Sequence, residues 1–304
     1  MKWRCALTLI GCLAAPFANA ALHVVIVEGL GGEAAFATQF AEQAGAIRKA
    51  SLALSDAEHV HLLDSKAATR TAVLGLFATI DATATADDRL ALFLIGHGSY
   101  DGSEYKLNIT GPDLTGSDLK DLLTKFPARD QLIVVAGSSS GALQDVLKSS
   151  ARVVMTGTRS GSERNATRFG AELVKALTDA AADTDKNGSL SAQEAFEFAQ
   201  RNVKAFYERE VRLASEHAQI SGDRAGRFAL ARVAGGNAGG AGAASAATPL
   251  DAVTQAQRDQ INNALDALRL RKSDMPEDEY NAKLEALLLQ LATLDEGAGG
   301  ASPP

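Results

Sequence analysis

Short apolar runs alternate with stretches of helical periodicity along the first two thirds of the chain. The apolar runs lie at residues 22–28, 59–63, 90–95, 132–135 and 152–156. Continuous runs of this kind are typical of strands that are buried on both faces of a parallel sheet. Apolar residues at helical spacing predict helices between them, at residues 34–53, 66–79, 117–126, 141–148 and 165–178. The alternation predicts an α/β fold with a doubly wound, mostly parallel sheet and helices on both faces.

The last third of the chain changes character at a low-complexity segment. Residues 234–248 are almost entirely Gly, Ala and Ser and predict a flexible linker after a main domain at 21–233. Two leucine-striped helices, at 249–272 and 276–294, predict a helical hairpin over 249–295, followed by a disordered tail at 296–304. We expect the hairpin to cover its leucines against itself, the main domain or a second copy, so self-association is one expectation.

The first 20 residues have the pattern of a signal peptide. Lys2 and Arg4 precede an apolar stretch, and Ala18-Asn19-Ala20 fits the small-x-small rule for signal peptidase. Cleavage before Ala21 is therefore predicted, which places the mature protein in the periplasm or outside the cell. The apolar stretch is too short to span a bilayer. An alternative is a lipobox, which would anchor the protein through a lipidated Cys12.

Composition removes several classes of function. The formal net charge is −7, which argues against nucleic acid or an anionic membrane surface as a partner. Both cysteines, Cys5 and Cys12, lie within the predicted signal peptide. The mature chain would have no cysteine, which excludes disulfides, thiolate metal sites and cysteine nucleophiles.

Residues 183–194 match the calcium loop of an EF-hand at every position. Oxygen-bearing residues stand at loop positions 1, 3, 5, 7, 9 and 12, namely Asp183, Asp185, Asn187, Ser189, Ser191 and Glu194. Gly188 supplies the sharp turn at position 6, and helices are predicted on both sides, at 165–178 and 191–213. The alternative is a loop that only caps a helix. Because sensor EF-hands usually occur in pairs and we find one loop, the sequence predicts a structural Ca²⁺ site.

Two polar motifs follow neighbouring predicted strands. His97 lies between two glycines after the strand at 90–95, and Ser138 follows the strand at 132–135. Ligands of parallel α/β sheets bind beyond the carboxyl ends of the strands. Imidazole can accept the proton of a serine hydroxyl near neutral pH, and the amide of Gly98 is suited to stabilise an oxyanion. The alternatives are a packed histidine and a serine that caps a helix.

The order of these motifs resembles the caspase–legumain–gingipain group of cysteine peptidases. There, a His-Gly follows one strand and a Cys-x-Ser-Gly follows the next; here the segments are Gly96-His97-Gly98 and Ser138-Ser139-Ser140-Gly141. The segments Thr156 to Glu163 and Ser215 to Gln219 resemble bacterial legumain-like proteins. The resemblance covers about residues 22–222 and implies a caspase-like fold.

The resemblance also implies roles for individual residues. His97 matches the catalytic base, Ser138 the nucleophile position, and Gly98 with the Ser138 amide the oxyanion hole. Arg159 and Glu163 would lie on a loop that shapes the substrate pocket. Two departures from the family pattern weaken the transfer of activity: serine replaces the cysteine, and Gly31 stands where legumains carry an asparagine that orients the histidine.

The serine-rich turn at residues 137–141 also fits two other kinds of site. Gly137-x-Ser139-x-Gly141 is also the nucleophile-elbow pattern of α/β-hydrolases, with His217 following in the order which that fold requires. The same small residues before a helix suit a phosphate, although no lysine stands nearby.

We therefore expect an exported, calcium-stabilised peptidase homologue that acts as a binding or scaffold domain for a peptide or protein ligand. The alternatives are a serine hydrolase that uses Ser138 and His97, or an esterase that uses Ser139.

Overall fold

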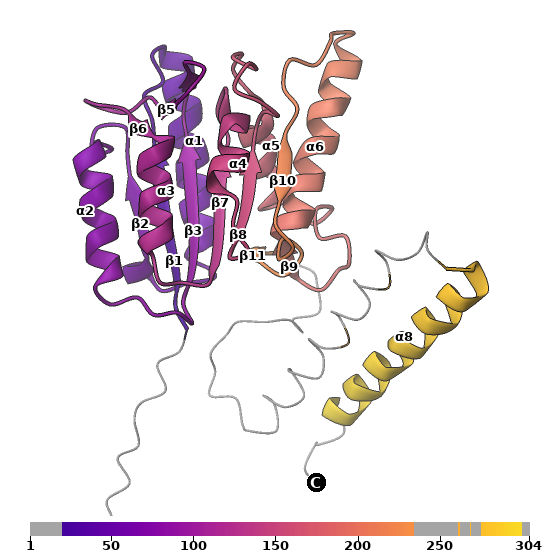
Figure 1. The fold of residues 1–304 in the computed structure, drawn as a ribbon. Coiled ribbons are helices and arrows are strands. Elements are labelled where there is room, and N and C mark those ends of the chain that lie inside the picture. The colour runs from indigo at the N-terminus through magenta and orange to yellow at the C-terminus, as the bar shows by residue number, and fades with distance from the viewer. Residues whose placement is uncertain (1–19, 234–260, 262–267, 269–274, 300–304) are drawn as a thin grey trace, which may run out of the picture. The chain divides into compact units, whose positions relative to one another are not determined.

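The structure is a computed structural model that describes residues 20–233, Ile261, Leu268 and 275–299 (Figure 1). The chain divides into two compact units, Met1–Gly242 and Ala243–Pro304. The boundary between the units falls inside the predicted linker, which lies outside the described residues. None of the described helices is long and apolar enough to cross a membrane.

The first unit is built around a six-stranded sheet in the order β10-β8-β7-β3-β1-β2. Five strands are parallel: β1 (Leu22–Glu28), β2 (Val60–Leu63), β3 (Arg89–Ile95), β7 (Asp130–Val135) and β8 (Arg152–Thr156). They coincide with the five apolar runs of the sequence, because every residue of β1 and nearly every residue of β3 and β7 is buried. The predicted α/β fold class with a mostly parallel sheet is confirmed. The sixth strand, β10 (Gln219–Ser221), is antiparallel to β8 and was not predicted.

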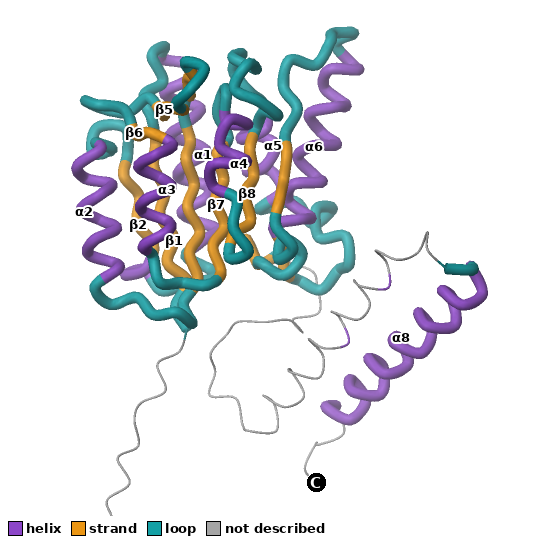
Figure 2. Tube along the Cα trace, in the orientation of Figure 1, coloured by secondary structure: helices purple, strands orange, loops and turns teal. Residues whose placement is uncertain are grey.

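Helices cover both faces of this sheet, as Figures 1 and 2 show. One hydrophobic core lies between the sheet and α1 (Ala34–Ser51), α5 (Phe169–Ala176) and α6 (Ala192–Arg209). The other lies between the opposite face and α2 (Arg70–Asp81), α3 (Gly116–Lys125) and α4 (Leu143–Leu147). The strands supply alternate residues to the two cores, which explains why their sequences are apolar throughout.

Capping decides several helix boundaries that the sequence pattern placed differently. Helix α3 begins one residue earlier than the predicted start at residue 117, because Thr115 is the N-cap and forms a capping box with Asp118. Helix α2 begins at Arg70 rather than near 66, because the side chain of Thr69 accepts the amide of Ala72. Helix α6 begins with a capping box between Ser191 and Glu194.

Two small antiparallel sheets complete the unit. One contains β4 (Gly98–Tyr100), β5 (Tyr105–Leu107) and β6 (Leu114–Thr115). The other pairs β9 (Ser189–Ser191) with β11 (Ala229–Arg232). Single 3-10 turns occur at η1 (Ala57–His59) and η2 (Ser140–Ala142).

In the second unit the structure describes one continuous helix, α8 (Glu277–Gly299). It corresponds to the predicted helix at 276–294 but extends five residues further, into the segment that was predicted to be a disordered tail. The predicted helix at 249–272 lies outside the described residues, apart from Ile261 and Leu268, so the hairpin stays a prediction.

Candidate functional site

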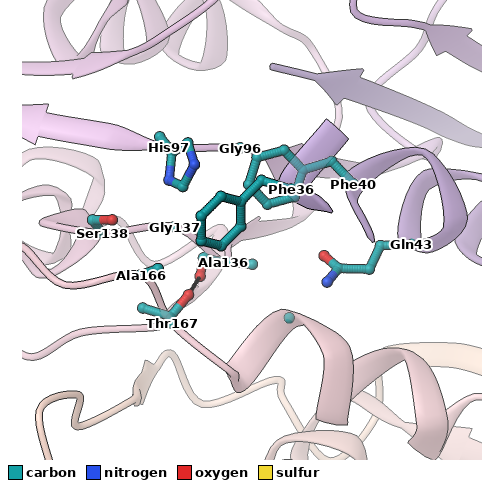
Figure 3. A pocket seen from close by; sticks show the side chains of 11 residues that line it. Phe36, Phe40, Gln43, Gly96, His97, Ala136, Gly137, Ser138, Ala166 and Thr167 are labelled. Carbon is teal, nitrogen blue, oxygen red and sulfur yellow. Dashed lines mark hydrogen bonds between the residues drawn. The ribbon is translucent and has the colours of Figure 1, made fainter. Parts of the chain in front are cut away.

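His97 and Ser138 lie at the same edge of the sheet. Strands β3 and β7 are hydrogen-bonded neighbours in parallel register, with Leu94 opposite Val135. His97 and Ser138 each follow one of these strands, and both line a single pocket together with side chains of α1 (Figure 3). The expectation that the fold brings the two residues to one edge is confirmed.

Two phenylalanines of α1 hold the imidazole of His97. The ring centroid of Phe36 lies 4.7 Å from that of His97, and the centroid of Phe40 lies 5.0 Å away, both in edge-to-face geometry. Within residues 20–233, no side chain or backbone group forms a hydrogen bond with the imidazole. The His97 ring is therefore positioned by apolar packing, and no carboxylate or amide selects its tautomer.

Ser138 is 4% exposed, and its hydroxyl has no hydrogen-bond partner among the described residues. The hydroxyl and His97 are therefore not joined by the hydrogen bond that a nucleophile and its base require. The pocket itself has a volume of about 10 Å³. This is the space of roughly one water molecule, so a ligand side chain enters only if the pocket walls move.

The floor of the pocket is built from backbone in close contact. A Cβ atom at Gly137 would overlap the carbonyl oxygen of Gly96, and one at Gly98 would lie 2.5 Å from the carbonyl oxygen of Ser138 and overlap the hydroxyl of Tyr105. Glycine is required at both positions because β3, β4 and β7 converge here.

Replacing Gly137 with alanine is expected to lower the free energy of unfolding by about 2–3 kcal/mol, because the added methyl group meets backbone that cannot rotate away. Gly45→Ala on α1 is the matched control: a Cβ there meets nothing within 4 Å, and the change should stabilise the helix by about 0.5–1 kcal/mol. Urea unfolding of both variants measures the difference. Equal stability of the two variants would contradict the described packing.

Ser139 has the strained backbone of a nucleophile elbow, with a φ of 55°, but not the exposed hydroxyl that an elbow requires. Its side chain is fully buried, and its hydroxyl has no hydrogen-bond partner among the described residues. His217, the predicted base of the esterase, forms a hydrogen bond through Nδ1 with Glu163 Oε1 at 2.6 Å. The structure thus does not bring Ser139 and His217 together by a hydrogen bond.

Glu163 links two loops at the strand edge. Its carboxylate accepts the Arg159 guanidinium at 3.0 Å and the backbone amides of Arg159 and His217 at 3.1 and 3.0 Å. Neither Arg159 nor Glu163 is among the residues that line the pocket of His97 and Ser138. The predicted role of these two residues in a substrate pocket stays a prediction. No local sequence pattern signals the pairing of Glu163 with His217, which is 54 residues away.

Glu216 is a second residue that sequence reasoning missed. It is 2% exposed, and its carboxylate accepts the amides of Arg168 and Phe169 at the start of α5 and the hydroxyl of Tyr207. Burial raises the pKa of Glu216. By capping α5 from a distance, Glu216 fixes the segment that carries Ala166 and Thr167 into the pocket wall.

The predicted calcium loop brings its acidic ligands together. Carboxylate oxygens of Asp183, Asp185 and Glu194 lie within 4.8 Å of one another. Asp183 accepts the amides of Asn187 and Gly188 at 3.2 and 2.9 Å, which closes the loop around the cluster. Burial and the neighbouring carboxylates raise the pKa of Asp185. Hard carboxylate oxygens in a tight loop fit Ca²⁺.

The other predicted ligands lie on the same loop with their oxygens engaged locally. Asn187 Oδ1 accepts the amide of Ser189 at 2.7 Å, and the Ser191 hydroxyl donates to Glu194 Oε2 at 2.7 Å. Ser189 and Ser191 form the ends of β9, whose central residue Leu190 is buried opposite Ala231 of β11. Strand β11 therefore pairs with the strand of the predicted calcium loop.

Comparison with known proteins gives matches only at the level of three-dimensional structure. No model of a protein family matches the chain, and no curated protein matches it. A caspase-1 from Spodoptera frugiperda matches with 10% identity and a TM-score of 0.48, over 70% of this chain and 93% of the caspase chain. A structural-genomics protein from Geobacter sulfurreducens matches with 14% identity and a TM-score of 0.45, over 66% of this chain and 92% of its own. Similarity at this level carries no conclusion about activity.

Proposed function

We propose that the first unit is an exported, calcium-stabilised binding domain that holds a peptide or protein segment at the carboxyl edge of its sheet and does not cleave it. The observation that carries the proposal is how the imidazole of His97 is held. Two phenylalanine rings pack against it, and no polar group among the described residues forms a hydrogen bond with it. The proposal covers the region around the pocket of His97 and Ser138.

The chemistry of serine explains why this arrangement favours binding. A serine hydroxyl becomes a useful nucleophile only when a base takes its proton in the same step. An oriented imidazole does this because a third group holds its tautomer and stabilises the imidazolium that forms. His97 has no third group, and the Ser138 hydroxyl makes no hydrogen bond to it. Both parts of the proton transfer are therefore missing in the described geometry.

The location of the pocket supports a binding role. It lies beyond the carboxyl ends of β3 and β7, where ligands of parallel sheets bind, and it combines apolar rings with the amide side chain of Gln43 (Figure 3). The pocket is small as it stands, so a ligand side chain enters only if the pocket walls move.

A serine hydrolase that uses Ser138 and His97 is the second candidate function. Both side chains line one pocket, and catalytic hydrogen bonds are often absent until a substrate is bound. Reaction with a fluorophosphonate probe decides between the two candidate functions.

A fluorophosphonate probe, which reacts with activated serines, is expected to leave the mature protein unlabelled. The physical reason is that an unactivated serine hydroxyl is a weak nucleophile. Ser138→Ala is the control for any labelling that occurs. Covalent addition detected by mass spectrometry on wild type and lost in Ser138→Ala would establish the hydrolase and overturn the binding role.

A further inference from the structure

A buried carboxylate binds the amide of Ala21, at the start of β1. Asp88 Oδ1 accepts the Ala21 N–H at 2.7 Å, and Asp88 Oδ2 accepts the N–H of Thr85, also at 2.7 Å. Asp88 is 7% exposed, which is unusual for a carboxylate. The carbonyl oxygen of Ala21 accepts a hydrogen bond from the backbone amide of Arg89 at 2.8 Å. The nitrogen of Ala21 is thus fixed against a nearly buried negative charge.

An independent observation concerns the same nitrogen. The segment Ala18-Asn19-Ala20 predicts that signal peptidase cleaves the bond between Ala20 and Ala21. Hydrolysis of this bond adds water across it: the new carboxylate leaves on Ala20, and the new amine stays on Ala21 and takes up a proton. The atom that becomes an ammonium group is the one that Asp88 already contacts.

We propose that Asp88 is the receptor for the α-ammonium group that processing creates on Ala21. Removal of the leader then turns a hydrogen bond between a neutral amide and the Asp88 carboxylate into an ion pair between an ammonium group and that carboxylate. The ion pair forms only in the processed chain, where it adds to the hydrogen bond that already holds Ala21, the residue before β1. The inference rests on the predicted cleavage and is independent of the function proposed for the pocket of His97.

The other charged groups near Asp88 do not replace the ammonium group as the cation that pairs with its carboxylate. On β1, His23 Nε2 lies 3.7 Å from Asp88 Oδ2, and the ring of His59 lies 4.7 Å from the ring of His23. Burial, followed by the proximity of His59, lowers the pKa of His23, and burial also lowers that of His61 on β2. The Arg89 guanidinium lies over the ring of Phe228. The lowered pKa of His23, the histidine nearest to Asp88, favours its neutral form, so the ammonium is the cation that pairs with Asp88.

Two chains that differ by one residue test the ion pair. A protease that leaves no extra residue releases one chain that begins at Ala21 and another that begins at Ala20. The second chain carries its ammonium one residue, about 3.8 Å, further from Asp88. At pH 7.5 the Tm of the chain that begins at Ala21 is expected to be higher by about 2–4 °C. Equal Tm values would overturn the proposal.

The pH dependence has a defined sign. Pairing with Asp88 raises the pKa of the α-amino group above its usual range of about 7.7–8.0. The added stability is complete below that range and is lost as the pH rises through the raised value. The Tm difference between the two chains should therefore vanish near pH 10. A difference that persists there would show that the ammonium charge is not its cause.

Substitutions separate Asp88 from its neighbours. Asp88→Asn should abolish the Tm difference between the two chains, whereas Asp87→Asn, which changes the adjacent exposed carboxylate, should leave it intact. If Asp88→Asn does not fold, acylation of the wild-type amines by acetic anhydride at varied pH decides the question. An α-amino pKa above about 8 for Ala21 supports the pair, and an ordinary value overturns it.

The processing step has its own readout. N-terminal sequencing of the full-length chain, recovered after expression in a bacterium with signal peptidase, should begin at Ala21. Any other first residue would overturn the link to processing, while the comparison of the two purified chains would still decide whether Asp88 binds the ammonium.

Discussion

Removing calcium from the mature protein with a chelator is expected to lower its Tm by about 5–10 °C when the metal had been present at a hundredfold excess over its Kd. Binding to the folded state at this excess contributes about 2.7 kcal/mol, and each kcal/mol corresponds to about 2–4 °C for a domain of this size. The reason is structural: Asp183, Asp185 and Glu194 crowd three carboxylates within 4.8 Å, and their repulsion is relieved by a cation. Thermal unfolding with calcium and with EGTA gives the difference.

The control for this experiment must separate calcium binding from helix capping. Glu194 also caps α6 through Ser191, so its loss alters stability even without metal. The informative quantity is therefore the calcium-dependent part of the Tm. Glu194→Gln should abolish that part, because the bidentate carboxylate is lost, while Glu208→Gln, on the exposed surface of the same helix, should preserve it. A Tm that does not respond to calcium in wild type would reject the site.

A cysteine placed at position 138 is expected to react with iodoacetamide at least about tenfold more slowly than a cysteine in an unfolded peptide. Burial raises the pKa of a thiol, and one unit of pKa removes about nine tenths of the thiolate at neutral pH. Ser138 is 4% exposed, and the pocket has room for about one water molecule. A wild-type chain that begins at Ala21 lacks Cys5 and Cys12 and so has no cysteine, and labelling of Ser138→Cys in that chain is measured without background.

The same variant tests whether His97 can be made into a base. The legumain-like asparagine cannot be restored at position 31, because a Cβ at Gly31 would lie 2.6 Å from the Cα of Ala37 and overlap its amide. Phe36 contacts His97 directly and is half-buried, so Phe36→Asn offers an amide to the imidazole without backbone strain. The double variant Phe36→Asn/Ser138→Cys should be alkylated faster than Ser138→Cys alone. The control Phe36→Ala/Ser138→Cys should show a smaller increase in the alkylation rate. A single variant Ser138→Cys that outpaces the peptide would instead support the hydrolase.

The sequence predicted the parallel sheet well because its strands are buried on both faces. That burial demands apolar residues at every position, as in Val24 to Val27 of β1. Strand β10 was not predicted because it is short and lies at the edge of the sheet, where only part of each residue is buried. Strand β11 was not predicted because its residues, Ala229 to Arg232, show no alternation of apolar and polar side chains that distinguishes them from a loop.

The candidate site was predicted in its location but not in its contacts. Topology alone places His97 and Ser138 together, because their strands are neighbours. The contacts of His97 with Phe36 and Phe40 depend on how α1 packs across the strand ends, which periodicity does not specify. The bonds of Glu163 with His217 and of Glu216 with α5 join residues about 50 positions apart. No local pattern encodes such pairs.

The pairing of β9 with β11 has a mechanical consequence. Strand β11 ends at Arg232, and the next residue, Val233, donates its amide to the carbonyl of Gly188 at the turn of the calcium loop. Val233 is the last residue of the first unit that the structure describes. Tension applied through the residues that follow would be borne by the β9–β11 ribbon before it reaches the six-stranded sheet. A cation bound at Asp183, Asp185 and Glu194 would stiffen the strand that carries this load, so calcium would set the force at which the first unit begins to unravel from its C-terminal end.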